Sequence, residues 1–309
     1  MLALFGGNGF IGRHVQAVLV ERGLAFEVLD RPPQGLATTS HGAPLRPIDF
    51  ADPDTYAAIL ARARVAVLFV SASTPGTFAD DLPGEVAANV VPYSRFLKAL
   101  EGTPVERVVY LSSGGTVYGD AGPGPIGEDA PLAAISPYGL GKVMIEAMIA
   151  AAARRAPWRA SVLRPGNPVG PGQAGAGQGL IAAIIRKVVA GEPLEMWGDG
   201  ETVRDYFDVR DLARAVADCT TDDAALDGTF NVGSGRGMSV NAVIEAVARV
   251  SGLSVDVVRR PARGIDVAAN VLDISRIERT LGWRPLIPFE RSVRDMLLAS
   301  QGGPSASGG

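Results

Sequence analysis

Tyr138 and Lys142 stand four residues apart at the start of an apolar stretch of this 309-residue chain. On a helix, side chains at that spacing lie on one face, one turn apart. A phenol has an ordinary pKa of about 10, so it must be lowered by about three pH units, near 4 kcal/mol, to act as a base at neutral pH. A neighbouring ammonium and a nearby nicotinamide cation would both favour the phenolate. The pair predicts a lysine-assisted acid/base, although a packed tyrosine and a solvated lysine would give the same spacing.

A second chemical signal is a glycine-rich turn near the start of the chain, Gly6-Gly7-Asn8-Gly9-Phe10-Ile11-Gly12. The turn follows a short apolar run and opens a helical pattern, so its backbone N–H groups can face a pyrophosphate. Asp30 lies 18 residues after Gly12, at the end of the second expected strand. A carboxylate there accepts ribose hydroxyls and repels a 2′-phosphate, which predicts NAD rather than NADP. Arg31 is the contrary feature, and a turn without a ligand is the alternative.

The elements that position these residues alternate between short apolar runs and helical patterns. Expected strands cover residues 2–5, 26–30, 65–70 and 107–111, and expected helices cover 11–22, 56–62, 86–100 and 137–154. This order predicts an α/β fold, a Rossmann-type doubly wound parallel sheet covered on both faces.

The second half of the chain is organised differently. Proline and glycine crowd residues 165–179, and helices are expected at 180–190, 209–219 and 240–250, with strands at 194–197 and 229–232. We predict an NAD-binding domain of residues 1–165 plus about 208–232. Residues 166–207 and 233–300 are expected to form a smaller C-terminal cap that binds substrate, and residues 301–309 a disordered tail.

Composition limits the classes of partner and site. The net charge is −4 and 47% of the residues are hydrophobic, so we expect a globular protein with no affinity for nucleic acid or anionic membranes. The single cysteine, Cys219, excludes an internal disulfide, and with His14 and His41 it is too few ligands for a His/Cys metal cluster. We expect a cytoplasmic protein without a metal, a targeting segment or a membrane span.

The surroundings of the Tyr/Lys pair carry a family resemblance. Ser136-Pro137-Tyr138-Gly139-Leu140-Gly141-Lys142 follows Leu111-Ser112-Ser113-Gly114-Gly115-Thr116-Val117-Tyr118-Gly119. Together they resemble the extended short-chain dehydrogenase/reductases, and within them the NAD-dependent nucleotide-sugar epimerase/dehydratase family of UDP-glucose 4-epimerase type. Similar blocks follow in the family's order at residues 163–172, 197–206, 230–235, 263–266 and 281–285.

The resemblance implies a set of cofactor contacts. Asp49 and Phe50 fall where the family contacts adenine, and Ser71, Ala72 and Asn89 fall where its chain passes the cofactor. The full expected set is Gly6, Gly9, Phe10, Ile11, Gly12, Asp30, Arg31, Asp49, Phe50, Ser71, Ala72, Asn89, Ser112, Tyr138, Lys142 and Pro165.

The resemblance also implies catalytic and substrate contacts. Tyr138 and Lys142 are the expected acid/base pair, but Gly114 stands where the family usually has a catalytic serine or threonine. Either Ser113 or Thr116 then supplies the bridging hydroxyl, or Tyr138 contacts the sugar directly. The expected substrate-binding residues are Ser113, Thr116, Asn167 at the phosphates, Trp197 beside uracil, the diphosphate-binding Arg204 and Arg263, and Asp266.

The activity implied is inversion of C4 of a nucleotide sugar through a transient 4-keto intermediate, with the hydride passing to NAD and back. A nucleotide-4-keto-sugar reductase uses the same Tyr/Lys pair and stays open. A 4,6-dehydratase needs an acidic pair where this chain has Gly115 and Thr116, and a non-catalytic NAD-sensing protein tends to lose the Tyr/Lys pair. The sugar is open, with Asn270 near its C2 substituent. Kinship also implies a homodimer through helices 86–100 and 137–154, whose apolar residues burial within a monomer explains almost as well.

Overall fold

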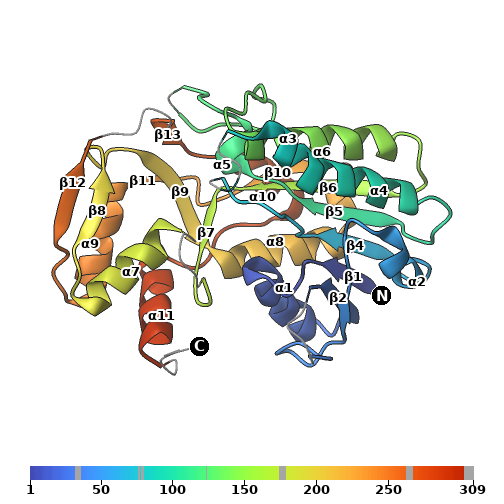
Figure 1. Cartoon of the computed structure of the whole chain (residues 1–309), viewed down its shortest axis with the longest axis horizontal. Helices are drawn as coiled ribbons and strands as arrows, with labels where there is room; N and C mark the ends of the chain where they lie inside the picture. Colours follow the sequence, from blue (N-terminus) through green and yellow to red (C-terminus); the bar gives the residue numbers. More distant parts are fainter. Residues whose placement is uncertain are drawn as a thin grey trace.

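A seven-stranded parallel sheet forms the centre of the molecule (Figure 1). The computed structural model describes residues 1–31, 36–75, 77, 80–122, 124–173, 179–261 and 267–302. The strand order is β10-β6-β5-β4-β1-β2-β3, and all neighbouring strands run parallel. The strands are β1 (Leu2–Phe5), β2 (Phe26–Asp30), β3 (Leu45–Pro47), β4 (Val65–Leu68), β5 (Arg107–Leu111), β6 (Arg159–Pro165) and β10 (Thr229–Val232).

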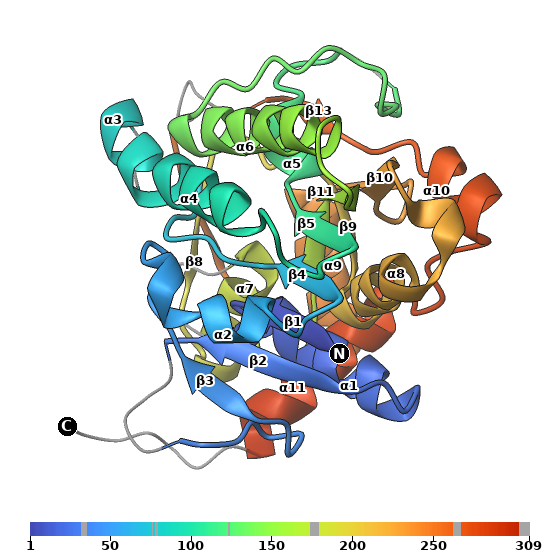
Figure 2. The same ribbon diagram turned by 90° about the vertical axis from the view of Figure 1, so that its right-hand side faces the viewer.

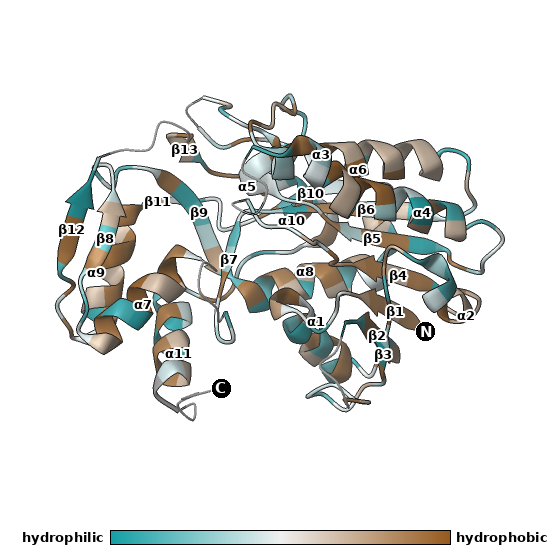
Figure 3. Ribbon diagram, in the orientation of Figure 1, coloured by the Kyte–Doolittle hydropathy of each residue, from teal (hydrophilic) through white to brown (hydrophobic). Residues whose placement is uncertain are grey.

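Helices bury both faces of this sheet. Helices α1 (Phe10–Glu21) and α8 (Val209–Thr221) cover one face, whereas α2 (Ala57–Leu60), α4 (Val91–Ala99) and α6 (Pro137–Ala153) cover the other (Figure 2). Alternation along β1 shows the pattern, because Leu4 packs with α1 and α8 while Phe5 packs against Tyr56 and Phe96. A strand buried on both sides reads as a continuous apolar run, and Figure 3 shows the inner strands as largely hydrophobic. The predicted doubly wound fold is confirmed.

A second group of elements lies at the other end of the molecule in Figure 1. Strand β9 (Val203–Asp208) pairs with β7 (Asn167–Val169), β11 (Gly237–Ser239) and β13 (Ala269–Asn270), and β8 (Leu194–Trp197) pairs with β12 (Val257–Arg260). Helices α7 (Leu180–Ala190), α9 (Val240–Ser251) and α11 (Phe289–Gly302) share an apolar core with them, and α10 (Ser275–Leu281) packs near β10. Strand β10 is part of the seven-stranded sheet and helix α8 packs on that sheet, although both follow β9 in the chain. The domain boundaries drawn from the sequence stay a prediction.

The expected helix over residues 86–100 is interrupted. The chain forms α3 (Leu82–Glu85), then a π-helical turn, η2 (Val86–Val90), and then α4. π-Helical turns within helices often occur at functional sites, and this one carries Asn89. Among the helices described, none combines the length and apolar composition that a bilayer crossing requires. The expected disordered tail of residues 301–309 begins too early, because residues 301 and 302 are the last two of α11, and residues 303–309 lie outside the described residues.

Candidate active site

Helix α6 places Tyr138 and Lys142. Its first turn is set by Ser136, whose hydroxyl accepts a hydrogen bond from the Gly139 N–H at 3.2 Å, and by Pro137 at the first helical position. The buried Lys142 Nζ donates to the carbonyl oxygen of Leu111 at 3.3 Å and lies 5.4 Å from the centre of the Tyr138 ring. The two side chains therefore lie close together on one face of α6, as the four-residue spacing predicts, and Lys142 contacts the end of β5.

The ionisation of the pair differs from the expectation. Burial raises the pKa of Tyr138 to about 12, and the Glu85 carboxylate acts in the same direction, while a hydrogen bond with Ser113 lowers it. Burial lowers the pKa of Lys142 to about 8, which Glu85 and Glu146 oppose. In the protein without its cofactor the Lys142 ammonium does not offset the burial of the phenol. The nicotinamide cation, which we expect to act together with Lys142, is the remaining source of a lowered pKa.

The segment after β5 supplies the neighbouring hydroxyls. Ser113 precedes the short helix α5 (Gly114–Val117) and hydrogen-bonds Tyr138. Thr116 Oγ1 is buried without a hydrogen-bond partner in the described part of the chain. A Cβ on Gly114 would lie 2.7 Å from the carbonyl oxygen of Arg164, closer than side chains approach. The chain path leaves no room for a serine at Gly114 without movement of the β6 backbone.

A buried ion pair holds these segments together. Arg164 Nη2 on β6 lies 2.6 Å from Glu146 Oε2 on α6, and both side chains are less than a tenth exposed. Ser112 donates its hydroxyl to Glu146 Oε1, and Arg164 Nη1 donates to the Tyr118 hydroxyl at 2.9 Å. Because buried charges are stable only when paired and hydrogen-bonded, this network fixes β5, β6 and α6 relative to one another.

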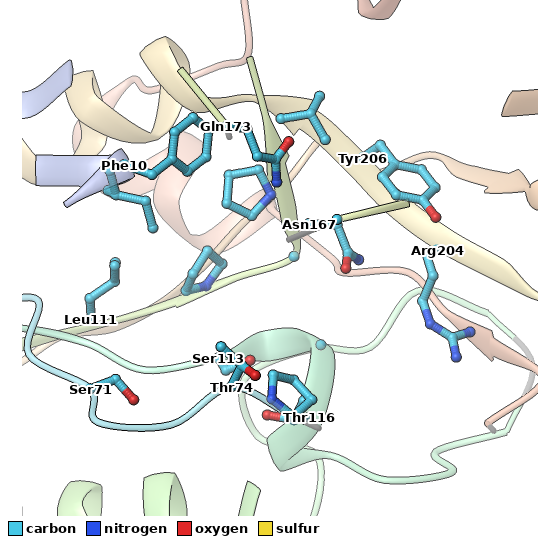
Figure 4. A pocket seen from close by; sticks show the side chains of 18 of the residues that line it. Phe10, Ser71, Thr74, Leu111, Ser113, Thr116, Asn167, Gln173, Arg204 and Tyr206 are labelled. Atoms are coloured by element: carbon cyan, nitrogen blue, oxygen red, sulfur yellow. The ribbon is translucent and has the colours of Figure 1, made fainter. Parts of the chain in front are cut away.

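A cavity of about 530 Å³ opens at the carboxyl ends of the strands, the usual ligand position in such sheets (Figure 4). Figure 4 shows Ser113, Thr74 and Thr116 on one side and Asn167, Tyr206 and Arg204 on another. The expected site residues that line it are Phe10, Ile11, Ser71, Ser112, Ser113, Thr116, Tyr138, Lys142, Pro165, Asn167 and Arg204.

A second cavity, of about 210 Å³, lies beside the glycine turn. The Asp30 carboxylate is tied to that turn, because it accepts a hydrogen bond from the Asn8 N–H at 2.8 Å. It also accepts one from the N–H of its neighbour Arg31 at 2.8 Å. A Cβ on Gly12 would lie 2.3 Å from the carbonyl oxygen of Gly7, so only glycine lets α1 start against the turn. The expected residues lining this cavity are Gly6, Gly9, Asp30, Arg31, Phe50 and Ser71.

Phe69 and Ser71 line both cavities. An elongated ligand can therefore run from Asp30, past the start of α1, to Tyr138, which is the shape a dinucleotide requires. Helix α1 presents its N-terminus near the junction, where it favours a pyrophosphate.

Comparison with known proteins agrees with this geometry. Residues 2–233 match the profile of the "NAD dependent epimerase/dehydratase family". The chain belongs to this family.

Relatives within the family have two different activities in their names. The dTDP-4-dehydro-6-deoxyglucose reductase of Escherichia coli is 30% identical, covering 96% of this chain and 95% of that protein. The UDP-glucose 4-epimerase of Mycolicibacterium smegmatis is also 30% identical, covering 93% and 94%. The solved UDP-glucose 4-epimerase of Thermotoga maritima with UDP-glucose has a TM-score of 0.90 at 27% identity, covering 97% and 98%. That of Thermus thermophilus with NAD has a TM-score of 0.89 at 28% identity, covering 98% and 99%.

NAD, the cofactor of this family, fits the two adjoining cavities, but not every expected contact lines them. Gly12, Asp49, Ala72 and Asn89 are not among the lining residues. The Asn89 side chain accepts a hydrogen bond from the Ala72 N–H at 2.8 Å and donates to Ser73 Oγ and Glu85 Oε1, each at 2.9 Å. Asn89 therefore fixes the backbone of the segment after β4 through Ala72 and Ser73, without lining the cavities itself.

The expected substrate contacts divide in the same way. Asn167 Nδ2 donates to the Asp205 carbonyl at 3.3 Å, and Arg204 Nη1 donates to two carbonyls at 2.8 Å, those of Val203 and Val267. Trp197 is 46% exposed and does not line either cavity described above. Arg263 and Asp266 lie outside the described residues, and the buried Asn270 donates to the Gly114 carbonyl rather than lining the large cavity.

Several lining residues were not expected from the sequence. Thr74 and Pro75 follow β4, in a Ser/Thr/Pro-rich stretch whose position after a parallel strand was a usable signal. Gln173 lies in the Pro/Gly-rich stretch after β7, and Tyr206 belongs to a block that resembles the family but was given no role. Glu85, which lines neither cavity but acts on the pKa of Tyr138 and of Lys142, carried no signal in the sequence.

Proposed function

We propose that this protein is an NAD-dependent epimerase that inverts C4 of a UDP-sugar. The observation that carries the proposal is that Ser113, Tyr138 and Lys142 line one cavity, and that this cavity adjoins the Asp30 cavity. The similarity to UDP-glucose 4-epimerases over nearly the whole chain supports the nucleotide and the reaction.

In the proposed mechanism, Tyr138 Oη is the atom that exchanges the proton. When bound, NAD would supply the hydride acceptor and donor for C4 of the sugar. Tyr138 Oη takes the proton of the C4 hydroxyl and gives it back, while the Ser113 hydroxyl bridges the phenol and the sugar. Lys142 stabilises the phenolate from the ring side. Asn167 and Arg204 hold the nucleotide part, so the sugar is free to present either face.

The chemistry of the cavity disfavours dehydration. None of the described residues lining the cavity is acidic, and removal of a proton at C5 followed by loss of water needs an additional acid and base. The polar groups found there, Ser113, Thr116 and Tyr138, suit proton exchange at one hydroxyl.

A nucleotide-4-keto-sugar reductase is the second candidate. It is favoured by the E. coli reductase, which matches this chain over 96% of its length. The two functions differ in whether NAD stays bound through turnover or is exchanged.

The test is to purify the protein, measure its bound NAD, and incubate it with UDP-glucose, UDP-N-acetylglucosamine and UDP-glucuronic acid. Separation of a C4 epimer without added cofactor supports the epimerase. Reduction of a nucleotide-4-keto sugar by added NADH, with no epimer from any UDP-sugar, would replace it with the reductase.

We also propose a homodimer formed through α4 and α6. Val91 and Met144 on these helices are 38% and 36% exposed, and a second copy of the chain would cover them in such a dimer. Sedimentation measurements at several protein concentrations test this.

A further inference from the structure

A buried carboxylate lies directly behind the Tyr138/Lys142 pair. Glu85 ends α3, is 2% exposed, and packs against Gly141 on α6. A Cβ on Gly141 would lie 2.6 Å from Glu85 Oε1 and 3.0 Å from its Cγ. Gly141 precedes Lys142 and lies one turn after Tyr138, so the carboxylate reaches the helix between the two functional residues.

Hydrogen bonds satisfy only part of this carboxylate. Glu85 Oε1 accepts a hydrogen bond from Asn89 Nδ2 at 2.9 Å. Glu85 Oε2 is buried and has no partner among the residues that the structure describes. A buried carboxylate oxygen without a donor is costly unless an opposite charge lies near it.

The surrounding groups leave one cation for that role. Helix α6 presents Tyr138, Lys142 and Glu146, β5 presents Tyr110, and α4 presents Tyr93. Burial raises the pKa of both Tyr93 and Tyr110, so neither carries charge near neutral pH. Glu146 is paired with Arg164 at 2.6 Å. Lys142 donates a hydrogen bond to the Leu111 carbonyl, and among the described groups around Glu85 it is the cation that remains for this carboxylate.

We propose that Glu85 is a positioning residue of the active site, the counter-charge that keeps Lys142 protonated and in place and sets the pH at which Tyr138 ionises. This inference rests on the proposed roles of Tyr138 and Lys142. Glu85 opposes the loss of charge from Lys142 and also opposes ionisation of the phenol. The Tyr138 phenol therefore stays protonated until a cation enters the large cavity that Tyr138 lines. Formation of the base is in this way coupled to occupancy of the site.

The decisive variant is Glu85→Gln, which keeps the shape and the hydrogen bond from Asn89 but removes the charge. Without the negative charge, both Tyr138 and Lys142 lose their protons at lower pH. Both limbs of the pH profile of kcat/KM should move down, by about one pH unit. A merely structural role for Glu85 would lower the rate or the stability and leave the limbs where they are.

A second measurement does not depend on turnover. The ultraviolet absorbance of the phenolate is titrated in the NAD complex, and the same titration of Tyr138→Phe is subtracted to isolate Tyr138. The phenolate of the Glu85→Gln protein should appear at lower pH by about the same interval. If no nucleotide sugar reacts, the proposed function fails while this titration still decides the role of Glu85.

Further variants keep the result unambiguous. Glu85→Asp retains the charge and should stay near the wild-type profile, whereas Glu85→Ala should shift in the same direction as Glu85→Gln. Glu101→Gln, which removes an exposed partner of Lys98, is the matched control. The proposal would be overturned if the pH profile of kcat/KM and the phenolate titration were unchanged in Glu85→Gln or in Glu85→Ala. It would also be overturned if Glu85→Asp, which keeps the charge, shifted them equally.

Discussion

Replacement of Tyr138 by phenylalanine removes the one group that the mechanism requires to change its protonation state. The pKa of Tyr138 lies at about 12 in the protein alone, because burial and Glu85 outweigh the hydrogen bond with Ser113. The gap between that value and pH 7 corresponds to about 7 kcal/mol, at 1.36 kcal/mol for each pH unit. The positive nicotinamide ring must supply much of this, so the base forms only in the loaded site. A well-placed general base contributes about 10²- to 10⁴-fold, and kcat should fall by that factor in Tyr138→Phe.

The same substitution should disturb the fold little. It removes one hydrogen bond to Ser113, worth about 0.5–1.5 kcal/mol, and leaves the ring in place. NAD should be retained, because the glycine turn and Asp30 lie at the other end of the elongated site. Tyr56→Phe is the matched control, since it removes a buried phenol that donates to the Phe50 carbonyl at 3.3 Å outside the large cavity.

The assay is conversion of UDP-glucose or UDP-N-acetylglucosamine, followed by product separation across a range of pH. The phenolate is the active form, so the wild-type rate should rise with pH through the pKa of Tyr138 in the NAD complex. It should fall again where Lys142, whose pKa burial lowers to about 8, loses its proton. A Tyr138→Phe protein that turns over within about tenfold of wild type and keeps the acid limb would refute the assignment of the base.

Five other substitutions test the remaining site residues. Ser113→Ala should lower kcat more than Thr116→Ala does, because Ser113 already hydrogen-bonds Tyr138; equal losses in rate assays would leave the bridging hydroxyl open. Gly114→Ser should destabilise the protein by about 1–3 kcal/mol in denaturant titration, because its Cβ meets the Arg164 carbonyl, and should not restore Ser113→Ala. Asp30→Ala should weaken NAD retention and reduce discrimination against NADP, as measured by cofactor titration. Arg263→Ala should raise the KM for the nucleotide sugar far more than it affects NAD; an unchanged KM removes Arg263 from the diphosphate site.

The sheet could be predicted where strands read as unbroken apolar runs. β1, β2 and β5 occur at the expected residues because each is buried on both faces and carries a simple apolar pattern. β6 was not predicted as a strand, because its run includes Arg164, a charge that the fold buries by pairing it with Glu146. The helical pattern of residues 86–100 likewise gave no sign of the π-helical turn at Val86–Val90.

Spacing located much of the site, because a glycine turn and a Tyr/Lys pair each have a fixed local geometry. Spacing alone could not decide which residue supplies the hydroxyl that bridges Tyr138 and the sugar. Gly114 aligned with the position that usually carries it, but only the backbone shows that a Cβ there meets the Arg164 carbonyl. The sequence therefore left Ser113 and Thr116 equivalent, and the contact with Tyr138 separates them.

The raised pKa of Tyr138 in the protein without its cofactor could not be predicted from the sequence, and the cause is physical. The spacing to Lys142 predicts an attractive charge, but desolvation depends on everything else that packs around the ring. That environment includes Tyr93, Tyr110 and the Glu85 carboxylate, which come from segments more than 25 residues away along the chain. Since burial and Glu85 both favour the neutral phenol, an active base requires a positive charge delivered by the ligand. An enzyme built in this way gains reactivity only when its cofactor is bound, which suits a reaction whose cofactor stays in the site between turnovers.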